Sequence, residues 1–172
     1  MKNGTITLWG EKRYHSLDFY LKNTYHEKVY RIALNAGLSC PNRDGRLDTR
    51  GCIFCSAGGS GDFAASPTLS ITKQLETEKR ILRAKRNCNK FIAYFQNFTN
   101  TYDTMENLKI KYDSALIDER IVGLEIATRP DCINTNIAKL LATYTKKYYV
   151  CVDLGLQTSN DITAKFINRG YS

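Results

Sequence analysis

No apolar run in this 172-residue sequence approaches the length of a membrane-spanning helix. The first residues also lack the apolar stretch of a secretory signal, and no internal repeat or low-complexity segment stands out. We therefore expect a cytoplasmic protein with no membrane partner, where glutathione keeps thiols reduced. In that compartment clustered cysteines are more often metal ligands than disulfides.

Negative charge is the scarcer sign in this chain, with 17 Asp and Glu against 25 Lys and Arg, for a net charge of +8. Seven lysines and arginines but only two glutamates fall within residues 73–90. A basic balance favours an anionic partner, nucleic acid first, although a solvated lysine-rich face explains it equally well. The hydrophobic content of 42% is ordinary for one soluble domain with a core.

Short apolar segments alternate with amphipathic ones along most of the chain. Four segments are typical of strands, namely residues 29–34, 91–95, 121–126 and 148–156. Helices are expected over residues 68–87, with Pro67 in the first turn, and after the capping residues Thr104, Asn134 and Asn160. Continuous apolar strands joined by helices indicate an α/β fold with a parallel sheet.

The connections set the expected architecture. Right-handed crossovers would curve four such units in one sense, which predicts a partial (β/α) barrel of about four parallel strands with outer helices. A closed eight-unit barrel takes roughly 250 residues, so we expect a truncated chain or a fragment. Residues 1–28 are expected to pack as an extension over one end of the partial barrel formed by residues 29–172.

Three of the six cysteines lie in one glycine-rich segment that suits neither helix nor strand. Eleven residues separate Cys40 from Cys52, and two separate Cys52 from Cys55. A zinc site would need a fourth ligand, and the candidates His15, His26 and Cys88 stand in no paired spacing with the others. A dithiol redox pair would leave Cys40 idle. An iron–sulfur cluster uses all three thiolates and leaves one iron free to bind a small molecule.

Polar residues follow each expected strand, at the edge where parallel sheets bind ligands. Taken singly, such residues are more often turn and helix-cap residues. Glu125 differs because it lies within an apolar run, where a carboxylate needs either Arg129 or a ligand as its partner. We expect these clusters to share one rim with the three cysteines.

Several stretches occur in an order that resembles the radical S-adenosylmethionine (SAM) proteins, in the branch related to the Elongator catalytic subunit. They are RIALNAG (31–37), CPNRDG (40–45), GCIFC (51–55), FIAYFQ (91–96), TNTY (99–102), GLEIATRPDC (123–132), LGLQT (154–158) and NRG (168–170). The resemblance runs from about residue 9 to the end of the sequence. It includes a cysteine spacing wider than the common three-then-two pattern.

The resemblance implies a radical SAM enzyme with a [4Fe–4S] cluster on Cys40, Cys52 and Cys55. SAM would bind the free iron, and its reductive cleavage would give a 5′-deoxyadenosyl radical. The residues implied to contact SAM are Phe54, Gln96, Glu125, Gln157 and Arg169. Arg169 suits the SAM carboxylate because a guanidinium pairs with it bidentately.

No catalytic residue follows from the resemblance, and the substrate stays open. The branch suggests a tRNA base, and it implies an electron donor such as flavodoxin or ferredoxin. Radical chemistry on a small molecule is a second interpretation. A zinc-stabilised module that binds nucleic acid is a third.

Overall fold

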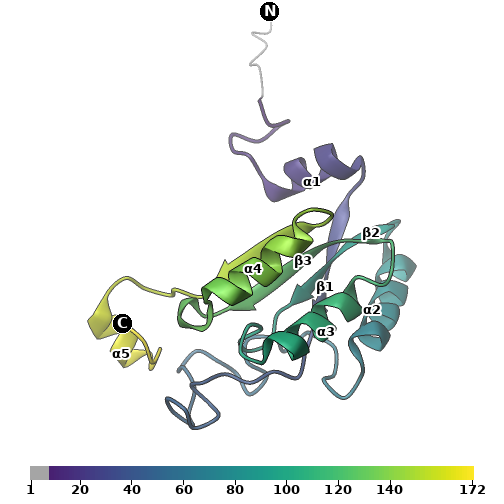
Figure 1. Cartoon of the computed structure of the whole chain (residues 1–172). Coiled ribbons are helices and arrows are strands. Elements are labelled where there is room, and N and C mark those ends of the chain that lie inside the picture. Colours follow the sequence, from purple (N-terminus) through teal and green to yellow (C-terminus); the bar gives the residue numbers. More distant parts are fainter. Residues whose placement is uncertain (1–7) are drawn as a thin grey trace, which may run out of the picture.

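The computed structural model describes residues 8–172, which form one four-stranded parallel sheet (Figure 1). The sheet order is β1-β2-β3-β4, which is also the order along the chain. The strands are β1 (Val29–Leu34), β2 (Lys90–Phe95), β3 (Ile121–Thr128) and β4 (Tyr149–Leu154). The α/β class with an all-parallel sheet and helices between strands, predicted from the sequence, is thereby confirmed.

The crossover helices cover one face of the sheet. Because each connection leads to the next strand in the same direction, right-handed crossovers bring all of them to that face. Figure 1 shows α3 and α4 lying side by side over the strands, with α2 beyond α3. The helices are α1 (Leu17–Tyr25), α2 (Ile71–Lys85), α3 (Met105–Ala115), the short 3₁₀ turn η1 (Pro130–Cys132), α4 (Thr135–Tyr144) and α5 (Asp161–Phe166).

Side-chain caps fix where most of these helices begin. Thr104, Asn134 and Asn160 each accept hydrogen bonds from the first turn, which confirms their expected roles. The expected start of α2 was wrong: Pro67 lies outside the helix, and Ser70 is the N-cap. Ser70 Oγ accepts a hydrogen bond from the backbone N–H of Lys73 at 3.2 Å. It thereby satisfies one of the unpaired N–H groups of the first helical turn, which the proline side chain cannot do because it has no acceptor.

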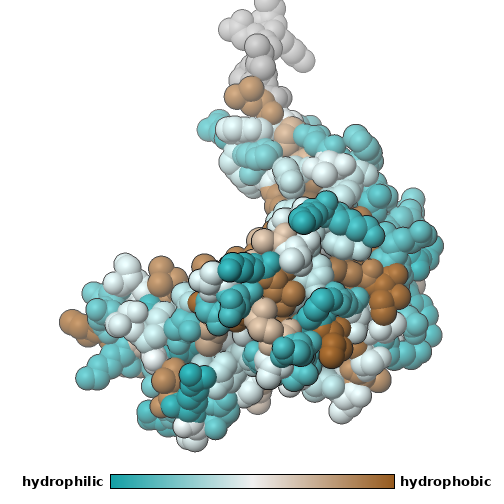
Figure 2. Space-filling model, in the orientation of Figure 1, coloured by the Kyte–Doolittle hydropathy of each residue, from teal (hydrophilic) through white to brown (hydrophobic). Residues whose placement is uncertain are grey.

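The core lies between the sheet and α2–α4. Alternate strand residues such as Leu34, Phe95 and Ile126 are fully buried and meet Leu108 and Tyr112 from α3. Figure 2 views this helix-covered side, where hydrophilic surface is interrupted by apolar patches over α2 and α3. None of the described helices is both long and apolar enough to cross a membrane.

The other face of the sheet carries polar residues. In register, Tyr94 of β2 is the partner of Glu125 of β3, and Glu125 is the partner of Cys151 of β4. These three alternate with the core residues, so they lie on the face that α2–α4 leave open. We call this the open face of the sheet.

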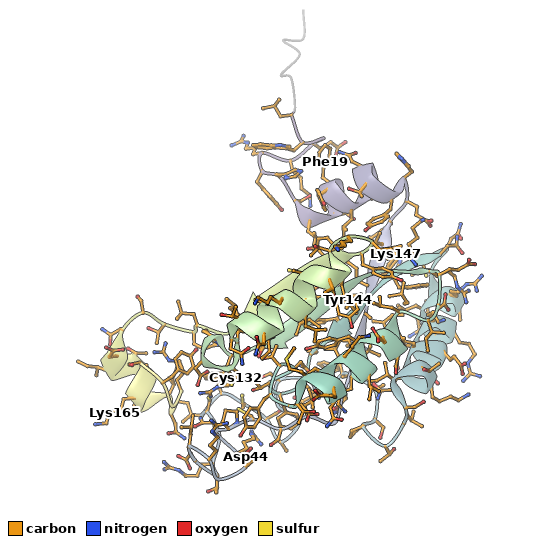
Figure 3. The ribbon with its side chains drawn as sticks, viewed as in Figure 1. Phe19, Asp44, Cys132, Tyr144, Lys147 and Lys165 are labelled. Atoms are coloured by element: carbon orange, nitrogen blue, oxygen red, sulfur yellow. The ribbon has the colours of Figure 1, made fainter. Side chains whose placement is uncertain are left out.

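The N-terminal part contacts the sheet near the amino ends of its strands. The Tyr25 hydroxyl, at the end of α1, donates to the Val122 carbonyl at 3.2 Å, and the rings of Tyr20 and Tyr149 lie 6.1 Å apart. Figure 3 shows Phe19 at this end of the molecule and Cys132 and Asp44 at the opposite end. The first seven residues of the expected extension, 1–28, lie outside the described residues.

Candidate metal centre and its pocket

Cys40, Cys52 and Cys55 line one pocket of about 260 Å³ at the carboxyl ends of the strands. The loop that carries them follows β1 directly and runs to the start of α2. All three thiols are free and half-buried. The sequence predicted that these cysteines and the polar strand ends share one rim, and the pocket brings Cys40, Gln96, Thr128 and Gln157 together.

Each of the three thiols has a polar neighbour of its own. Arg129 Nη1 lies 3.9 Å from Cys40 Sγ, and Asn42 Nδ2 lies 3.4 Å from Cys52 Sγ. Ser60 Oγ lies 3.5 Å from Cys55 Sγ. Such donors stabilise thiolates, because hydrogen bonds to a charged form favour that form.

The loop keeps its shape through hydrogen bonds of its own. Arg43 donates through Nη2 to the carbonyls of Cys55, at 3.1 Å, and Ser56, at 2.6 Å. Gly51 leaves room for this arginine side chain, since a Cβ at residue 51 would lie 2.7 Å from Arg43 Nε. Gly59 has a φ of 64°, and its missing side chain leaves room for the ring of Phe98. The thiols are therefore held by a folded loop.

Two of the thiols differ in acidity. The hydrogen bond from Cys52 lowers the pKa of the Cys55 thiol to about 6, against the effect of burial, with help from Ser60 and the charge of Arg43. The same contact, together with burial, raises the pKa of Cys52. One thiolate is thus available at neutral pH before any metal binds.

The last residues of the chain are tied to the same loop. Asn168 donates through Nδ2 to Asp48 Oδ2 at 2.9 Å and to the Gly51 carbonyl at 2.8 Å. The backbone N–H of Ile53 donates to the Ile167 carbonyl at 3.1 Å. These bonds close one side of the pocket with residues that are remote from the cysteines in the chain.

The other candidate metal ligands lie apart from the three thiols. Among residues 8–172, no group of three or more His, Cys, Asp or Glu side chains could hold one metal ion as it stands. The fourth zinc ligands weighed from the sequence lie elsewhere: Cys88 is in the core, and His15 and His26 flank α1.

Four of the five residues expected to contact SAM line the pocket. The Phe54 ring is 48% exposed next to Cys55. Gln96 Nε2 donates to the Ser60 carbonyl at 3.0 Å, so it also supports the loop. Gln157 stands in the left-handed region, with a φ of 67°.

Arg169, the fourth, is buried, and its guanidinium is already largely engaged. Nη1 donates to the carbonyls of Leu156 and Thr158, at 2.8 and 2.5 Å, while Nε and Nη2 donate to the Tyr171 carbonyl. One of the five N–H donors of an arginine remains for a ligand. Arg169 therefore shapes the pocket wall in addition to facing its interior.

Glu125, the fifth, does not line the pocket. Its side chain is 0% exposed and forms an ion pair with Arg31, whose Nε lies 2.6 Å from Oε2. Burial raises the pKa of Glu125 to about 7; Arg31 lowers it, and the facing carboxylate of Asp153 raises it. Burial also raises the pKa of Tyr94, to about 12, with the two carboxylates adding to the effect.

Sequence reasoning did not single out Asn42, Ser60 or Arg129 as partners of the thiols. The one available signal was the position of Asn42, two residues after Cys40 within the conspicuous loop. The sequence placed Arg129 at the rim and offered it as a partner for Glu125. In the structure Arg129 instead pairs with Asp131 at 2.8 Å and donates to the Arg169 carbonyl at 2.9 Å.

No model of a known protein family matches the chain. It is 45% identical over 161 residues to the Bacillus subtilis protein named "Uncharacterized protein YtqA", which covers 94% of this chain and 50% of that protein. It is 40% identical over 153 residues to "Protein YhcC" of Escherichia coli, covering 88% and 48%. A Methanocaldococcus jannaschii protein, "Uncharacterized protein MJ0486", is 34% identical over 159 residues, covering 88% and 47%. The chain spans about half the length of these relatives.

Proposed function

We propose that the chain is the cluster-binding portion of a radical SAM enzyme, in which Cys40, Cys52 and Cys55 hold a [4Fe–4S] cluster. The observation that carries the proposal is that three free thiols, each with its own polar neighbour, line one pocket at the carboxyl ends of a parallel sheet. Ligands of parallel α/β sheets bind at that edge. On this proposal the four-stranded sheet is part of a (β/α) barrel.

The bound cluster would supply one electron to SAM, whose carbon–sulfur bond then breaks to give a 5′-deoxyadenosyl radical. The chain's own residues bind and shield the reactants. Arg129 and Arg43 place positive charge beside the thiolates and offset the negative charge of a ligated cluster. The half-exposed Phe54 ring offers a flat apolar surface for an adenine next to Cys55.

The polar SAM contacts would come from the part of the pocket wall that follows β4. Arg169 keeps one N–H donor, which would bind the SAM carboxylate through a single charge-assisted hydrogen bond instead of the bidentate contact expected from the sequence. Gln157 is exposed and lines the pocket, so its amide is free to turn toward a ribose or an amino group. This wall belongs to the segment between β4 and the chain's last residues.

Anaerobic reconstitution with iron and sulfide tests the proposal. We expect about four irons and four sulfides per chain with broad visible absorption, and a reduced-cluster EPR spectrum that changes when SAM is added. Serine replacement of Cys40, Cys52 or Cys55 should abolish iron loading, whereas the matched control Cys151→Ser, in β4, should retain it. One colourless zinc per chain, or iron that survives all three serine replacements, would refute the proposal.

The basic stretch and the pocket are separate features of the described residues. None of the basic residues of 73–90 lines the pocket. tRNA as the substrate, and flavodoxin or ferredoxin as the electron donor, remain predictions from the sequence.

A further inference from the structure

Two side chains join the thiols to the last residues of the chain, which lie beside the cysteine loop (Figure 1). The first is Asn42, which is 1% exposed. Its Nδ2 lies 3.4 Å from Cys52 Sγ and donates to the Asn168 carbonyl at 2.5 Å. This nitrogen carries two N–H groups, so one serves the thiol while the other serves the carbonyl. The contact is close, because a Cβ at Gly170 would lie 2.6 Å from Asn42 Oδ1.

Arg129 makes the same kind of bridge to the next carbonyl along the chain. Its Nη1 lies 3.9 Å from Cys40 Sγ and donates to the Arg169 carbonyl at 2.9 Å. Asp131 holds the guanidinium in place, since it accepts from Nε at 2.9 Å and from Nη2 at 2.8 Å. Arg129 is buried as well, so water competes little for these donors. We call the contacts of Asn42 and Arg129 the two thiol bridges.

The residues that accept these bonds belong to the pocket wall. We call residues 167–171 the wall segment; it contains Arg169, which we propose to bind the SAM carboxylate. The Ile167 carbonyl also accepts a hydrogen bond, from the backbone N–H of Ile53 at 3.1 Å. Three consecutive carbonyls of the wall segment are therefore held by donors from other parts of the chain, and two of those donors also contact thiols.

The state of the thiols should affect these bridges. Metal-bound cysteines are thiolates, and a hydrogen bond to a charged acceptor is stronger than one to a neutral acceptor. Ligated thiols thus fix Asn42 and Arg129 more firmly, and with them the carbonyls that both side chains hold. The third thiol differs, because Ser60, the polar neighbour of Cys55, belongs to the cysteine loop itself.

We propose that Asn42 and Arg129 are positioning residues that couple assembly of the cluster to the order of the wall segment. Ligation of Cys40 and Cys52 orders this segment, which then presents Arg169 to SAM. The inference rests on the proposed cluster and adds an order of events, in which the cluster prepares the site for SAM. Coupling of this kind is reciprocal, so a change made in the wall segment alone weakens retention of the cluster.

Hydrogen exchange followed by mass spectrometry tests the coupling without measuring activity. Loading with iron and sulfide should slow exchange in peptides covering residues 160–172 about tenfold, while peptides from α3 stay unchanged. Asn42→Leu has a similar size but no N–H donor, so exchange in its apo form should already be about tenfold faster than in the wild type, and loading should slow it far less. The matched control is Ser60→Ala, which removes the polar neighbour of Cys55 and should keep the wild-type response.

The affinity for SAM provides a second measurement, taken from the change in the EPR spectrum of the reduced cluster. Arg129→Lys keeps the positive charge near Cys40, but an ammonium cannot reach Asp131, the thiol and the carbonyl together as the planar guanidinium does. We expect this variant to load as much iron as the wild type and to bind SAM about fivefold or more weakly. Gly170→Ala alters no thiol and no N–H donor, yet it should release iron to a chelator several-fold faster, because the coupling is reciprocal.

Three results would overturn the proposal: exchange of residues 160–172 that does not respond to loading, an unchanged SAM affinity in the iron-loaded Arg129→Lys variant, or a response that Ser60→Ala removes as fully as Asn42→Leu does. Should Asn42→Leu fail to fold, the wild-type response to loading and the Gly170→Ala variant decide. A chain that takes up no iron overturns the proposed function and this coupling with it. A chain that loads iron and binds SAM without any change in exchange overturns the coupling alone.

Discussion

The buried carboxylate of Glu125 should make the protein less stable as pH rises through neutrality. In the folded chain its pKa is raised from 4.5 to about 7 by burial, which outweighs the nearby Arg31. Between those two pH values the folded state holds a proton that the unfolded state has released. The free energy of unfolding therefore falls by about 1.4 kcal/mol for each pH unit across that window. The stabilisation is fully present below about pH 4.5 and is lost above about pH 7, a change of about 3 kcal/mol.

Glu125→Gln isolates this effect, because glutamine has nearly the same shape and cannot ionise. Urea unfolding of the reduced protein, measured from about pH 5 to about pH 8, should show the variant gaining about 2–3 kcal/mol on the wild type over that range. Contributions from other carboxylates cancel in the difference. The matched control is Glu119→Gln, at an exposed glutamate two residues before the start of β3.

Direct titration provides an independent check. The carbon-13 signal of the Glu125 carboxyl should titrate with a midpoint near 7, and Arg31→Gln should move that midpoint upward because the neighbouring cation favours the charged form. A stability difference that stays constant with pH to within about 0.5 kcal/mol, together with an unshifted midpoint, would refute the reasoning.

Three further predictions concern the scaffold and the basic surface. Gly59→Ala should destabilise the loop by roughly 2 kcal/mol and lower the iron retained after reconstitution, because its backbone is left-handed and a Cβ would meet the Phe98 ring. Tyr112→Phe should cost about 1–2 kcal/mol in urea unfolding, because its buried hydroxyl donates to the Asn100 carbonyl at 2.5 Å; an unchanged midpoint would contradict this. If residues 73–90 bind tRNA, the affinity for tRNA should fall steeply as the salt concentration rises and should drop further when the arginines of this stretch are replaced by glutamate. An affinity that is unchanged by salt and by these replacements would exclude this surface.

Local chemistry explains which parts of the fold could be predicted from the sequence. Thr104, Asn134 and Asn160 cap helices through hydrogen bonds to their own first turns, so their roles could be inferred without tertiary information. The predicted start of α2 was wrong because a proline is only compatible with a first helical turn. Ser70 fixes the start, since its side-chain oxygen accepts a hydrogen bond from that turn. The order of strands and helices followed from the alternation of apolar segments.

The expected fourth strand, 148–156, was too long at its carboxyl end. β4 stops at Leu154, where the backbone N–H of Gly155 still donates to the Thr128 carbonyl at 2.9 Å. The chain then turns away at Gln157, which has a positive φ of 67°. The apolar Leu156 resembled a strand residue, but it is 52% exposed. Hydrophobicity alone could not reveal this turn.

The candidate site, like the fold, could be predicted only in part from the sequence. The spacing of Cys40, Cys52 and Cys55 predicted that they belong together, and they share one pocket. Their polar neighbours could not be inferred, because Arg129 reaches Cys40 across 89 positions of the chain. The pairing of Glu125 with Cys151 depends on the register of β3 and β4, which one sequence does not specify.

The two ends of the pocket impose opposite electrostatic demands on whatever it binds. Three arginines near the thiols, Arg43, Arg129 and Arg169, favour a negatively charged group there, whereas Asp153 is the one acidic side chain among the described residues that line the pocket.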